Sequence, residues 1–369
     1  MILNSINILN YKNIAEASLS FSGKVNCFIG NNGMGKTNFL DAIYYLSFCR
    51  SFSSLTDAAV IRHDEPFMML QGSYTRNEAV EEVTISIQRG KRKVAKRNGK
   101  EYKRLSQHIG LLPIVMISPM DWDLIRGAGE ERRRLMDIII SQGNPLYLEA
   151  LIRYGKALVQ RNSMIKREFR DPLLYETVEM QLCESASLIH QHRVQWIEQF
   201  APIFMRHYQA IAGEDEEVQL SYRSHLNDAE LKQHLDQTRE RDFIIGHTTR
   251  GIHRDDIELL LNGHNMRQVG SQGQCKTYTI ALRLAQFEFI RRNNATTPIL
   301  LLDDIFDKLD ARRVESIVKV VSDEQFGQIF ITDTNRTHLD EIISHLDGDH
   351  AMFWVENGVC THLEGGTEA

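Results

Sequence analysis

The first 120 positions carry the hydrophobic pattern of strands. Apolar and polar residues alternate over positions 2–9 and again over 80–87, which predicts strands with one buried face. Apolar segments at 25–29, 68–74 and 111–117 predict further strands. This part of the chain is therefore expected to be rich in strands.

The spacing changes to that of helices over positions 121–245. Apolar residues recur three or four positions apart over 148–165 and again over 174–200. Asp171-Pro172 should separate two helices, because proline disfavours helical backbone at the residue before it. We expect long antiparallel helices packed into a compact arm that ends in an acidic loop at 213–217.

The remainder of the chain returns to alternating strands and helices. Strands are predicted at 257–261, 298–302 and 328–332, and helices at 275–292 and 312–321. Alternation of this kind is typical of an α/β fold.

A glycine-rich loop joins the strand at 25–29 to a helix predicted at 38–48. It matches the P-loop pattern G-x-x-x-x-G-K-[ST] with Gly30, Asn31, Asn32, Gly33, Met34, Gly35, Lys36 and Thr37. In such a loop, backbone N–H groups surround phosphate oxygens at a helix N-terminus. Lys36 would supply a charge for the β- and γ-phosphates, and Thr37 a hydroxyl for Mg²⁺. A plain glycine turn before a solvated lysine is the alternative, and the strand-loop-helix context argues against it.

Two adjacent carboxylates, Asp303 and Asp304, end the apolar strand at 298–302. Buried carboxylates are costly unless they are paired or bind a metal. We expect Asp303 to contact Mg²⁺ and Asp304 to orient an attacking water. The alternative is that both cap the following turn.

A second candidate phosphate site precedes the helix at 275–292 and consists of Ser271, Gln272, Gly273 and Gln274. Since the P-loop already surrounds one side of a nucleotide, a second site is useful if it closes over a nucleotide held by another copy. This predicts an ATP-dependent homodimer with two ATP molecules in an isologous interface. The alternative is an N-cap serine without a ligand.

These motifs together resemble the head of an ABC-type ATPase, with Asp307-Lys308-Leu309-Asp310 as the D-loop. More narrowly, the chain resembles the RecF family of bacterial recombinational repair proteins. The matching segments occur in family order at 10–13, 30–37, 50–52, 118–121, 131–134 with Asp137, 251–256, 271–276 and 301–304.

The resemblance implies an α/β fold, an ABC-type P-loop ATPase head of mixed sheets and flanking helices with an inserted antiparallel helical arm. Positions 1–120 would form the N-terminal part of the head, 121–245 the arm, and 246–369 the C-terminal part of the head. The P-loop residues would bind ATP, Thr37 and Asp303 would hold Mg²⁺, and Asp304 would be the catalytic carboxylate. Ser271, Gln272, Gly273 and Gln274 would face the γ-phosphate held by the partner copy.

The chain departs from the related patterns in several places. Asp304 is one methylene shorter than the glutamate common in ABC transporters, from which we expect weak, slow ATP hydrolysis suited to a switch. Thr332-Asp333 stands where transporters place a histidine. No clear Q-loop glutamine follows the strand at 111–117, and Asp121 is the candidate for that position. Ser53 stands where the family commonly has arginine.

The implied function is ATP-dependent DNA binding in recombinational repair. The resemblance implies action at single-strand gaps and junctions, recombinase loading with RecO and RecR mediators, and roles in replication and the SOS response. An ATPase subunit of an ABC transporter is the alternative, against which the long helical insertion and the missing histidine argue. A small-molecule kinase is a second alternative, but it would have no use for the segment at 271–274.

A local basic segment is the candidate DNA contact. Eight cations lie within positions 91–104 against one acid, Glu101, although the whole chain has a net charge of −6. Asn98-Gly99 predicts a hairpin tip within this segment. The candidate contacts are Lys91, Arg92, Lys93, Lys96 and Arg97, which would bind phosphates with little sequence preference. The alternative is a solvated charged face.

The remaining composition narrows the class of protein. The five cysteines are scattered without C-x-x-C spacing, which argues against a zinc site or a disulfide framework and favours a reducing cytoplasm. No apolar run reaches the roughly 18 residues of a membrane span, and the N-terminus lacks the pattern of a signal peptide.

Overall fold

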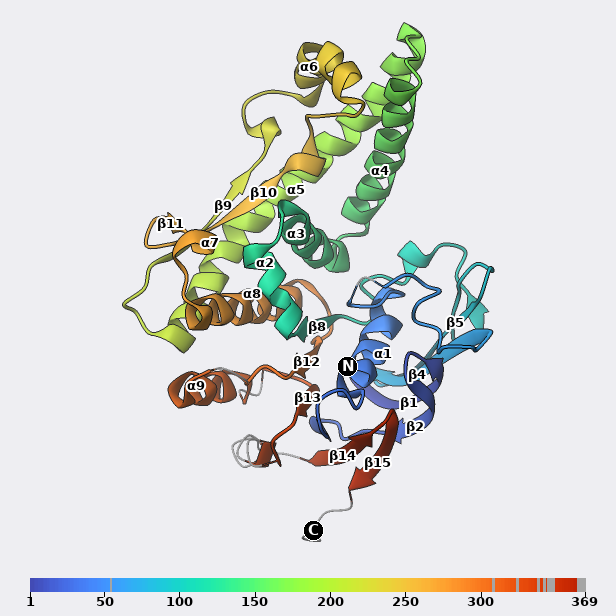
Figure 1. Ribbon diagram of the computed structural model, residues 1–369, viewed down its shortest axis with the longest axis vertical. Coiled ribbons are helices and arrows are strands. Elements are labelled where there is room, and N and C mark those ends of the chain that lie inside the picture. Colours follow the sequence, from blue (N-terminus) through green and yellow to red (C-terminus); the bar gives the residue numbers. More distant parts are fainter. Residues whose placement is uncertain are drawn as a thin grey trace. The chain divides into compact units, whose positions relative to one another are not determined.

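The computed structural model describes residues 1–53, 55–306, 309–322, 325–336, 339–340, 343 and 349–363 (Figure 1). The chain divides into two compact units. The first, called the head unit here, comprises Met1–Asp121 and Leu282–Ala369. The second, called the arm unit, comprises Trp122–Ala281.

A six-stranded, largely parallel sheet in the head unit has the strand order β15-β14-β3-β13-β12-β8. Its strands are β3 (Val25–Ile29), β8 (Ile114–Ile117), β12 (Ile299–Asp303), β13 (Ile329–Asp333), β14 (His350–Glu356) and β15 (Val359–Leu363). Only β15 runs antiparallel to its neighbour. The neighbouring strands β3, β13 and β12 therefore end at the same edge, where ligands of parallel sheets bind.

The second sheet of the head unit is antiparallel, with the order β2-β1-β4-β5-β6-β7. Its strands are β1 (Ile2–Tyr11), β2 (Ile14–Ser20), β4 (Phe67–Arg76), β5 (Ala79–Gln88), β6 (Val94–Arg97) and β7 (Lys100–Glu101). Helix α1 (Lys36–Phe48) contacts strands of both sheets. This position explains why α1 is apolar and buried on nearly every side rather than along one stripe.

The arm unit contains a helical pair and a small sheet. Its helices are α2 (Asp123–Arg126), α3 (Gly129–Gly143), α4 (Pro145–Lys166), α5 (Pro172–Ala212), α6 (Leu231–Ile245) and α7 (Met266–Val269). Its strands are β9 (Val218–Arg223), β10 (Asp256–Leu261) and β11 (His264–Asn265). Helices α4 and α5 pack side by side (Figure 1). Asp171 caps α5, and Pro172 is its first residue, as the break at this dipeptide predicted.

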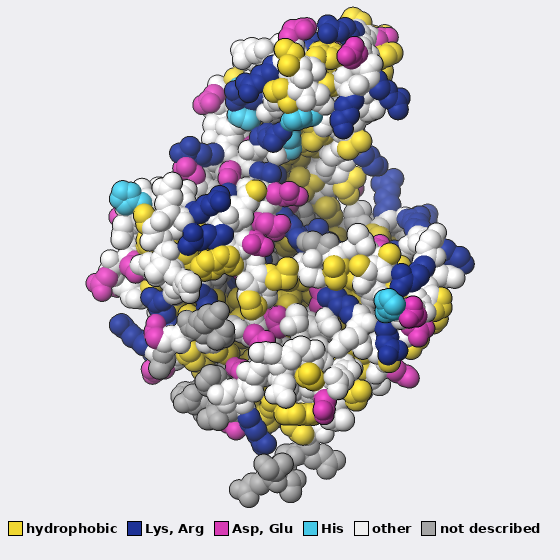
Figure 2. All heavy atoms as spheres, viewed as in Figure 1, with side chains coloured by type: hydrophobic (Ala, Val, Ile, Leu, Met, Phe, Trp, Pro, Cys, Tyr) yellow, Lys and Arg dark blue, Asp and Glu magenta, His cyan; other side chains and the backbone are white. Residues whose placement is uncertain are grey.

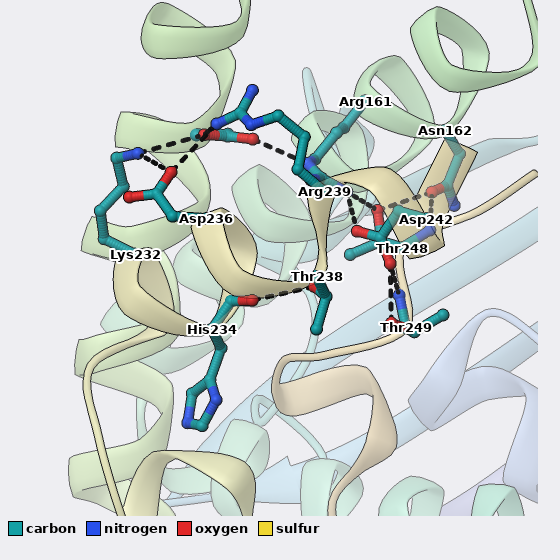
Figure 3. Close-up of polar contacts among 11 residues, drawn as sticks. Arg161, Asn162, Lys232, His234, Asp236, Thr238, Arg239, Asp242, Thr248 and Thr249 are labelled. Atoms are coloured by element: carbon teal, nitrogen blue, oxygen red, sulfur yellow. Dashed lines mark hydrogen bonds and ion pairs between the residues drawn. The ribbon is translucent and has the colours of Figure 1, made fainter. Parts of the chain in front are cut away.

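Buried charges join α4, α5 and α6 (Figure 3). The Arg161 guanidinium, fully buried, donates to Glu179 at 3.1 Å and to Asp242 at 2.7 Å. Arg239 donates to the other oxygen of Glu179 at 2.9 Å. Asp242 also accepts hydrogen bonds from Thr249 at 3.0 and 2.7 Å. Removing one partner of such a network leaves an uncompensated buried charge and costs roughly 3–5 kcal/mol, so the network fixes how these three helices pack.

Residues 246–281 fall in the arm unit, whereas the sequence had placed them with the C-terminal part of the head. The reason is strand pairing. Strand β10 pairs antiparallel with β9, with Leu259 opposite Leu220, and so extends the small sheet of the arm unit. Helix α8 (Gln272–Asn293) begins in the arm unit and ends in the head unit, which also contains α9 (Ala311–Val321).

No helix within the described ranges is both long and apolar enough to cross a membrane. All five cysteines are free thiols.

Candidate nucleotide-binding site

The P-loop joins β3 to α1 in the head unit. Gly33 and Gly35 have φ angles of +81° and +106°, a left-handed backbone that favours glycine. The Lys36 side chain is buried and folds back over the loop, where its ammonium donates to the carbonyl of Gly30 at 2.8 Å and to that of Asn31 at 3.2 Å. The loop therefore has the curled backbone and the central cation that a phosphate group requires.

Thr37 and Asp303 are 266 positions apart and meet at the end of the parallel sheet. The Thr37 hydroxyl donates to both carboxylate oxygens of Asp303, at 2.8 and 3.1 Å. Two hard oxygen donors in contact fit Mg²⁺, which typically takes one or two protein ligands and completes its shell with phosphate oxygens and water. The structure thus brings together the two residues predicted to hold the metal.

Thr332 at the end of β13 also belongs to this cluster. Its hydroxyl donates to Asp303 at 2.8 Å and accepts from the backbone N–H of Asp304 at 3.0 Å. The sequence marked Thr332 only as the place of a missing histidine. Its position after an apolar strand, like that of Asp303, was the available signal, because parallel strands bring such ends together.

Burial raises the pKa of Asp303 to about 6, and the hydrogen bonds from Thr332 and Thr37 oppose that rise. The nearby charge of Asp304 raises the pKa further, and that of Lys36 lowers it. A carboxylate held this deeply is stabilised by a cation, which is the environment expected of a metal ligand.

Asp304 follows β12 in a left-handed conformation with φ of +45°. Its backbone N–H is fixed by both the hydroxyl and the carbonyl of Thr332, at 3.0 and 3.3 Å. The backbone therefore turns sharply after Asp303 and leaves the strand. Of the predicted D-loop, Asp307 and Lys308 lie outside the described residues, while Asp310 caps α9 by accepting from the Arg313 N–H at 3.0 Å.

The predicted signature segment lies at the start of α8 and satisfies its own hydrogen bonds. The Ser271 hydroxyl accepts from the backbone N–H of Gln274 at 3.2 Å, and the side-chain oxygen of Gln274 accepts from the backbone N–H of Ser271 at 2.9 Å. This reciprocal pair is a capping box. The Gln274 amide also donates to Glu216 at 2.7 Å. Glu216 belongs to the acidic loop after α5, to which the sequence assigned no role.

Two further motif segments converge on Asp41 of α1. The buried Asp41 carboxylate accepts from the Tyr11 hydroxyl at 2.6 Å, from the Ser51 hydroxyl at 2.8 Å and from the Phe52 N–H at 2.6 Å. Lys12 lies 2.6 Å from the same carboxylate. The segments at 10–13 and 50–52 are therefore both held by one buried carboxylate of the helix that follows the P-loop.

The arginine motif at 131–134 takes part in ion pairs. Arg132 binds Asp256 with two hydrogen bonds of 2.7 and 2.8 Å. Arg134 lies 3.8 Å from Glu131, three positions earlier in the same helix. These contacts place the motif in the internal scaffold of the arm unit.

Asp121, the Q-loop candidate, is held by Arg283 of α8. The guanidinium donates to Asp121 at 3.0 and 2.5 Å, and the second carboxylate oxygen accepts from the Ser118 N–H at 3.0 Å. The carboxylate is buried in these contacts.

The basic segment at 91–104, which contains the hairpin of β6 and β7, divides the five predicted DNA contacts into two groups. Lys93 pairs with Asp57 at 2.6 Å, and Arg97 binds Glu81 with two hydrogen bonds of 2.5 Å. Lys91, Arg92 and Lys96 are exposed. Figure 2 shows lysine and arginine side chains at the surface around β5, which pairs with β6. The charges of the second group are exposed, and Arg92 also donates to the Lys103 carbonyl at 3.4 Å.

Comparison with known proteins finds one family along nearly the whole chain. Residues 2–360 match the family model described as RecF/RecN/SMC N terminal domain. The chain is similar to the DNA replication and repair protein RecF of Parabacteroides distasonis, with 54% identity over 99% of this chain and 100% of the relative. It is 51% identical to the RecF of Bacteroides thetaiotaomicron over 98% and 99% of the two chains.

Solved structures give the same result. A structure described as the recombination mediator protein RecF with ATP in the RecFOR pathway aligns with a TM-score of 0.88 and 28% identity, and covers 98% of both chains. An Smc head domain from Pyrococcus furiosus aligns with a TM-score of 0.57 and 16% identity, which shows a shared fold. The predicted fold class is thereby confirmed, and the transporter alternative loses its support. On identity and coverage together, the chain belongs to the RecF family of DNA replication and repair proteins.

Proposed function

We propose that the protein is an ATP-dependent DNA-binding protein of recombinational repair. ATP binds at the P-loop and drives two copies to close over it on DNA, and slow hydrolysis ends the association. The observation that supports this most strongly is the contact of Thr37, Asp303 and Thr332 beside a curled P-loop. A metal and a nucleotide phosphate would complete that arrangement.

The residues divide the work by chemistry. The Lys36 ammonium leaves the loop carbonyls and binds the β- and γ-phosphates, while loop N–H groups hold the phosphate oxygens. Thr37 and Asp303 would hold Mg²⁺, which supplies neutralising charge to the phosphates when bound. Asp304 orients the attacking water, and Thr332 fixes the turn from which Asp304 projects. The shorter side chain of Asp304 makes hydrolysis weak and slow, as suits a switch.

The signature segment completes the site from the other copy. In this proposal the hydrogen bonds between Ser271 and Gln274 open, and the segment contacts the γ-phosphate held by the partner through Ser271, Gln272, Gly273 and Gln274. ATP, but not ADP, provides that group. Dimerisation would therefore report the state of the nucleotide.

DNA would be held by exposed cations of the basic segment at 91–104. Lys91, Arg92 and Lys96 carry this role in preference to Lys93 and Arg97, whose charges are already paired. Following the family resemblance, we further propose action in the cytoplasm at single-strand gaps and junctions with RecO- and RecR-type mediators, in recombinase loading, replication and the SOS response.

Sedimentation of the chain with ATP, ADP or no nucleotide, with and without gapped duplex DNA, tests the central proposal. We expect a dimer only with ATP and a stable protein–DNA complex only under the same condition. A chain that stays monomeric with ATP and DNA would refute the switch.

The DNA surface is tested by replacing Lys91, Arg92 and Lys96 with alanine together. We expect weaker binding and a slope of log affinity against log salt reduced by roughly one unit for each lost contact. A matched control replaces three exposed arm cations, Arg153, Lys156 and Lys166. If the control has the larger effect, DNA binds elsewhere.

A further inference from the structure

The carbonyl of Met34, within the P-loop, is held from outside the loop by two donors. The backbone N–H of Gly358, in the turn between β14 and β15, donates to it at 2.9 Å. The side-chain amide of Asn13, in the turn between β1 and β2, donates to it at 3.3 Å. Two hairpin turns from opposite ends of the sequence thus meet at one atom of the P-loop.

Asn13 also connects the loop to the first turn of α1. Its side-chain oxygen accepts from the Asn38 amide at 2.7 Å. The Asn13 side chain also lies close to Gly35: a Cβ added to Gly35 would come within 2.5 Å of the Asn13 amide nitrogen. The single side chain of Asn13 therefore spans the last residues of the loop and the start of the helix.

The β14–β15 hairpin backs the loop at a second point. A Cβ at Gly30, the first P-loop residue, would approach the carbonyl oxygen of Val355 to 2.2 Å. Gly358 itself has φ of +80°, and a Cβ there would come within 2.5 Å of the Asn13 carbonyl oxygen. Only glycine fits either position without moving the backbone.

We propose that Asn13 and the Asn357-Gly358 turn, together called the loop bracket, are positioning residues for nucleotide binding. In a trans peptide the C=O and the following N–H point in opposite directions. Anchoring the Met34 carbonyl on the outside therefore directs the Gly35 N–H to the inside, toward the phosphate site. A loop held this way does not have to be ordered when the nucleotide binds.

This inference rests on the proposed function, because it takes the P-loop to be the ATP site. It adds a role for the C-terminal hairpin, whose turn donates to the Met34 carbonyl of the loop.

The first experiment replaces Asn13 with alanine in the full chain. We expect ATP affinity to fall roughly 3- to 10-fold, the worth of one or two ordinary hydrogen bonds. Amide hydrogen exchange over 30–37 should be faster in the nucleotide-free protein. Asn7→Ala is the matched control, because Asn7 is an exposed asparagine of the same hairpin that accepts from Ser18 at 2.8 Å and contacts no P-loop atom in the described structure.

The second experiment compares Gly358→Ala with Gly263→Ala. Both glycines follow asparagine in a turn with positive φ, +80° and +75°, so the backbone strain is the same. A Cβ at Gly263 meets nothing within 4 Å. We expect only Gly358→Ala to weaken ATP binding and to speed exchange at the P-loop.

The outcomes separate the two proposals. Faster loop exchange in Asn13→Ala and Gly358→Ala, with a wild-type chain that binds no ATP, would keep the bracket and refute the ATP site. A wild-type chain that binds ATP, with exchange and affinity unchanged in both variants, would refute the bracket. Equal effects of Gly358→Ala and Gly263→Ala would also refute it, because turn strain would then be the cause.

Discussion

Two helix N-termini in this protein carry glycine-containing segments, and their polar groups are arranged differently. At α1 the Lys36 ammonium donates to carbonyls of its own loop. The last P-loop residue, Thr37, donates to Asp303, which also accepts from Thr332. At α8 the Ser271 and Gln274 groups satisfy each other, and Gln274 is also held by Glu216. The first site is assembled within one chain, while the second is closed by its own side chains.

The difference fits the proposed switch. Under that proposal, the P-loop site has its cation and the proposed metal ligands in place and binds a nucleotide without a partner. The capped start of α8 would exchange its internal hydrogen bonds for those of an incoming phosphate, so it would respond only when the partner brings one. Four variants test this division between the two sites.

Lys36→Arg should have the largest effect. The planar guanidinium cannot take the place of a compact ammonium between the Gly30 and Asn31 carbonyls. We expect ATP affinity to fall roughly 100-fold, the upper range for a charged hydrogen bond, and ATP-driven dimerisation to be lost in sedimentation. Lys24→Arg is the control, since Lys24 also donates to a carbonyl, that of Phe326, at 2.9 Å. Normal dimerisation of Lys36→Arg with ATP would break the comparison.

Asp303→Asn should separate metal use from nucleotide binding. The amide keeps the shape of the carboxylate but loses the charge that would hold Mg²⁺. We expect ATP hydrolysis to fall by roughly 100-fold or more, whereas ATP binding measured without Mg²⁺ should persist. An unchanged dependence of hydrolysis on Mg²⁺ concentration would remove Asp303 from the metal site.

Thr332→Val should have a smaller effect of the same kind. It removes the hydroxyl that donates to Asp303 and accepts from the Asp304 N–H. Hydrolysis should fall by up to about 10-fold, the worth of a hydrogen bond or two. Thr332→Ser keeps the hydroxyl and should restore the rate. If serine and valine behave alike, the methyl packing of Thr332 matters and its hydroxyl does not.

Glu216→Gln should have the smallest effect, in the opposite direction. Removing a negative charge next to Gln274 lowers the repulsion of an approaching phosphate. We expect ATP-driven dimers to tighten by roughly 3-fold in sedimentation, while the affinity of the monomer for ATP stays constant. Glu214→Gln removes the same charge from an exposed neighbour. Equal changes in both variants would point to net charge and leave the α8 start without a special role.

Local sequence rules predicted most of the elements. The apolar run of β3 and the glycine-rich pattern before α1 predicted strand, loop and helix, and Gly33 and Gly35 have the positive φ that favours glycine. The break at Asp171-Pro172 follows from proline geometry. These features depend on neighbouring residues, so they can be read from a single chain.

Charge in the sequence was a weaker predictor of which cations could contact DNA. Five cations of the basic segment at 91–104 looked equivalent in sequence, yet Lys93 and Arg97 are bound to Asp57 and Glu81. Whether a lysine or arginine is paired depends on which acid the fold brings near it. Asp57 is 36 positions from Lys93, a separation that no local pattern records.

The sequence by itself determined the P-loop, the carboxylates that end β12, the helical insertion and, through its motifs, the family. Only the tertiary structure decided that Thr332 donates to Asp303 and that Gln274 donates to Glu216. It alone also decided that the β14–β15 turn and Asn13 donate to the Met34 carbonyl of the P-loop. The physical reason is the range of the interactions. Periodicity, turn conformation and capping act over a few residues, while these hydrogen bonds join residues 29, 58 and more than 300 positions apart, which only strand pairing and packing bring together.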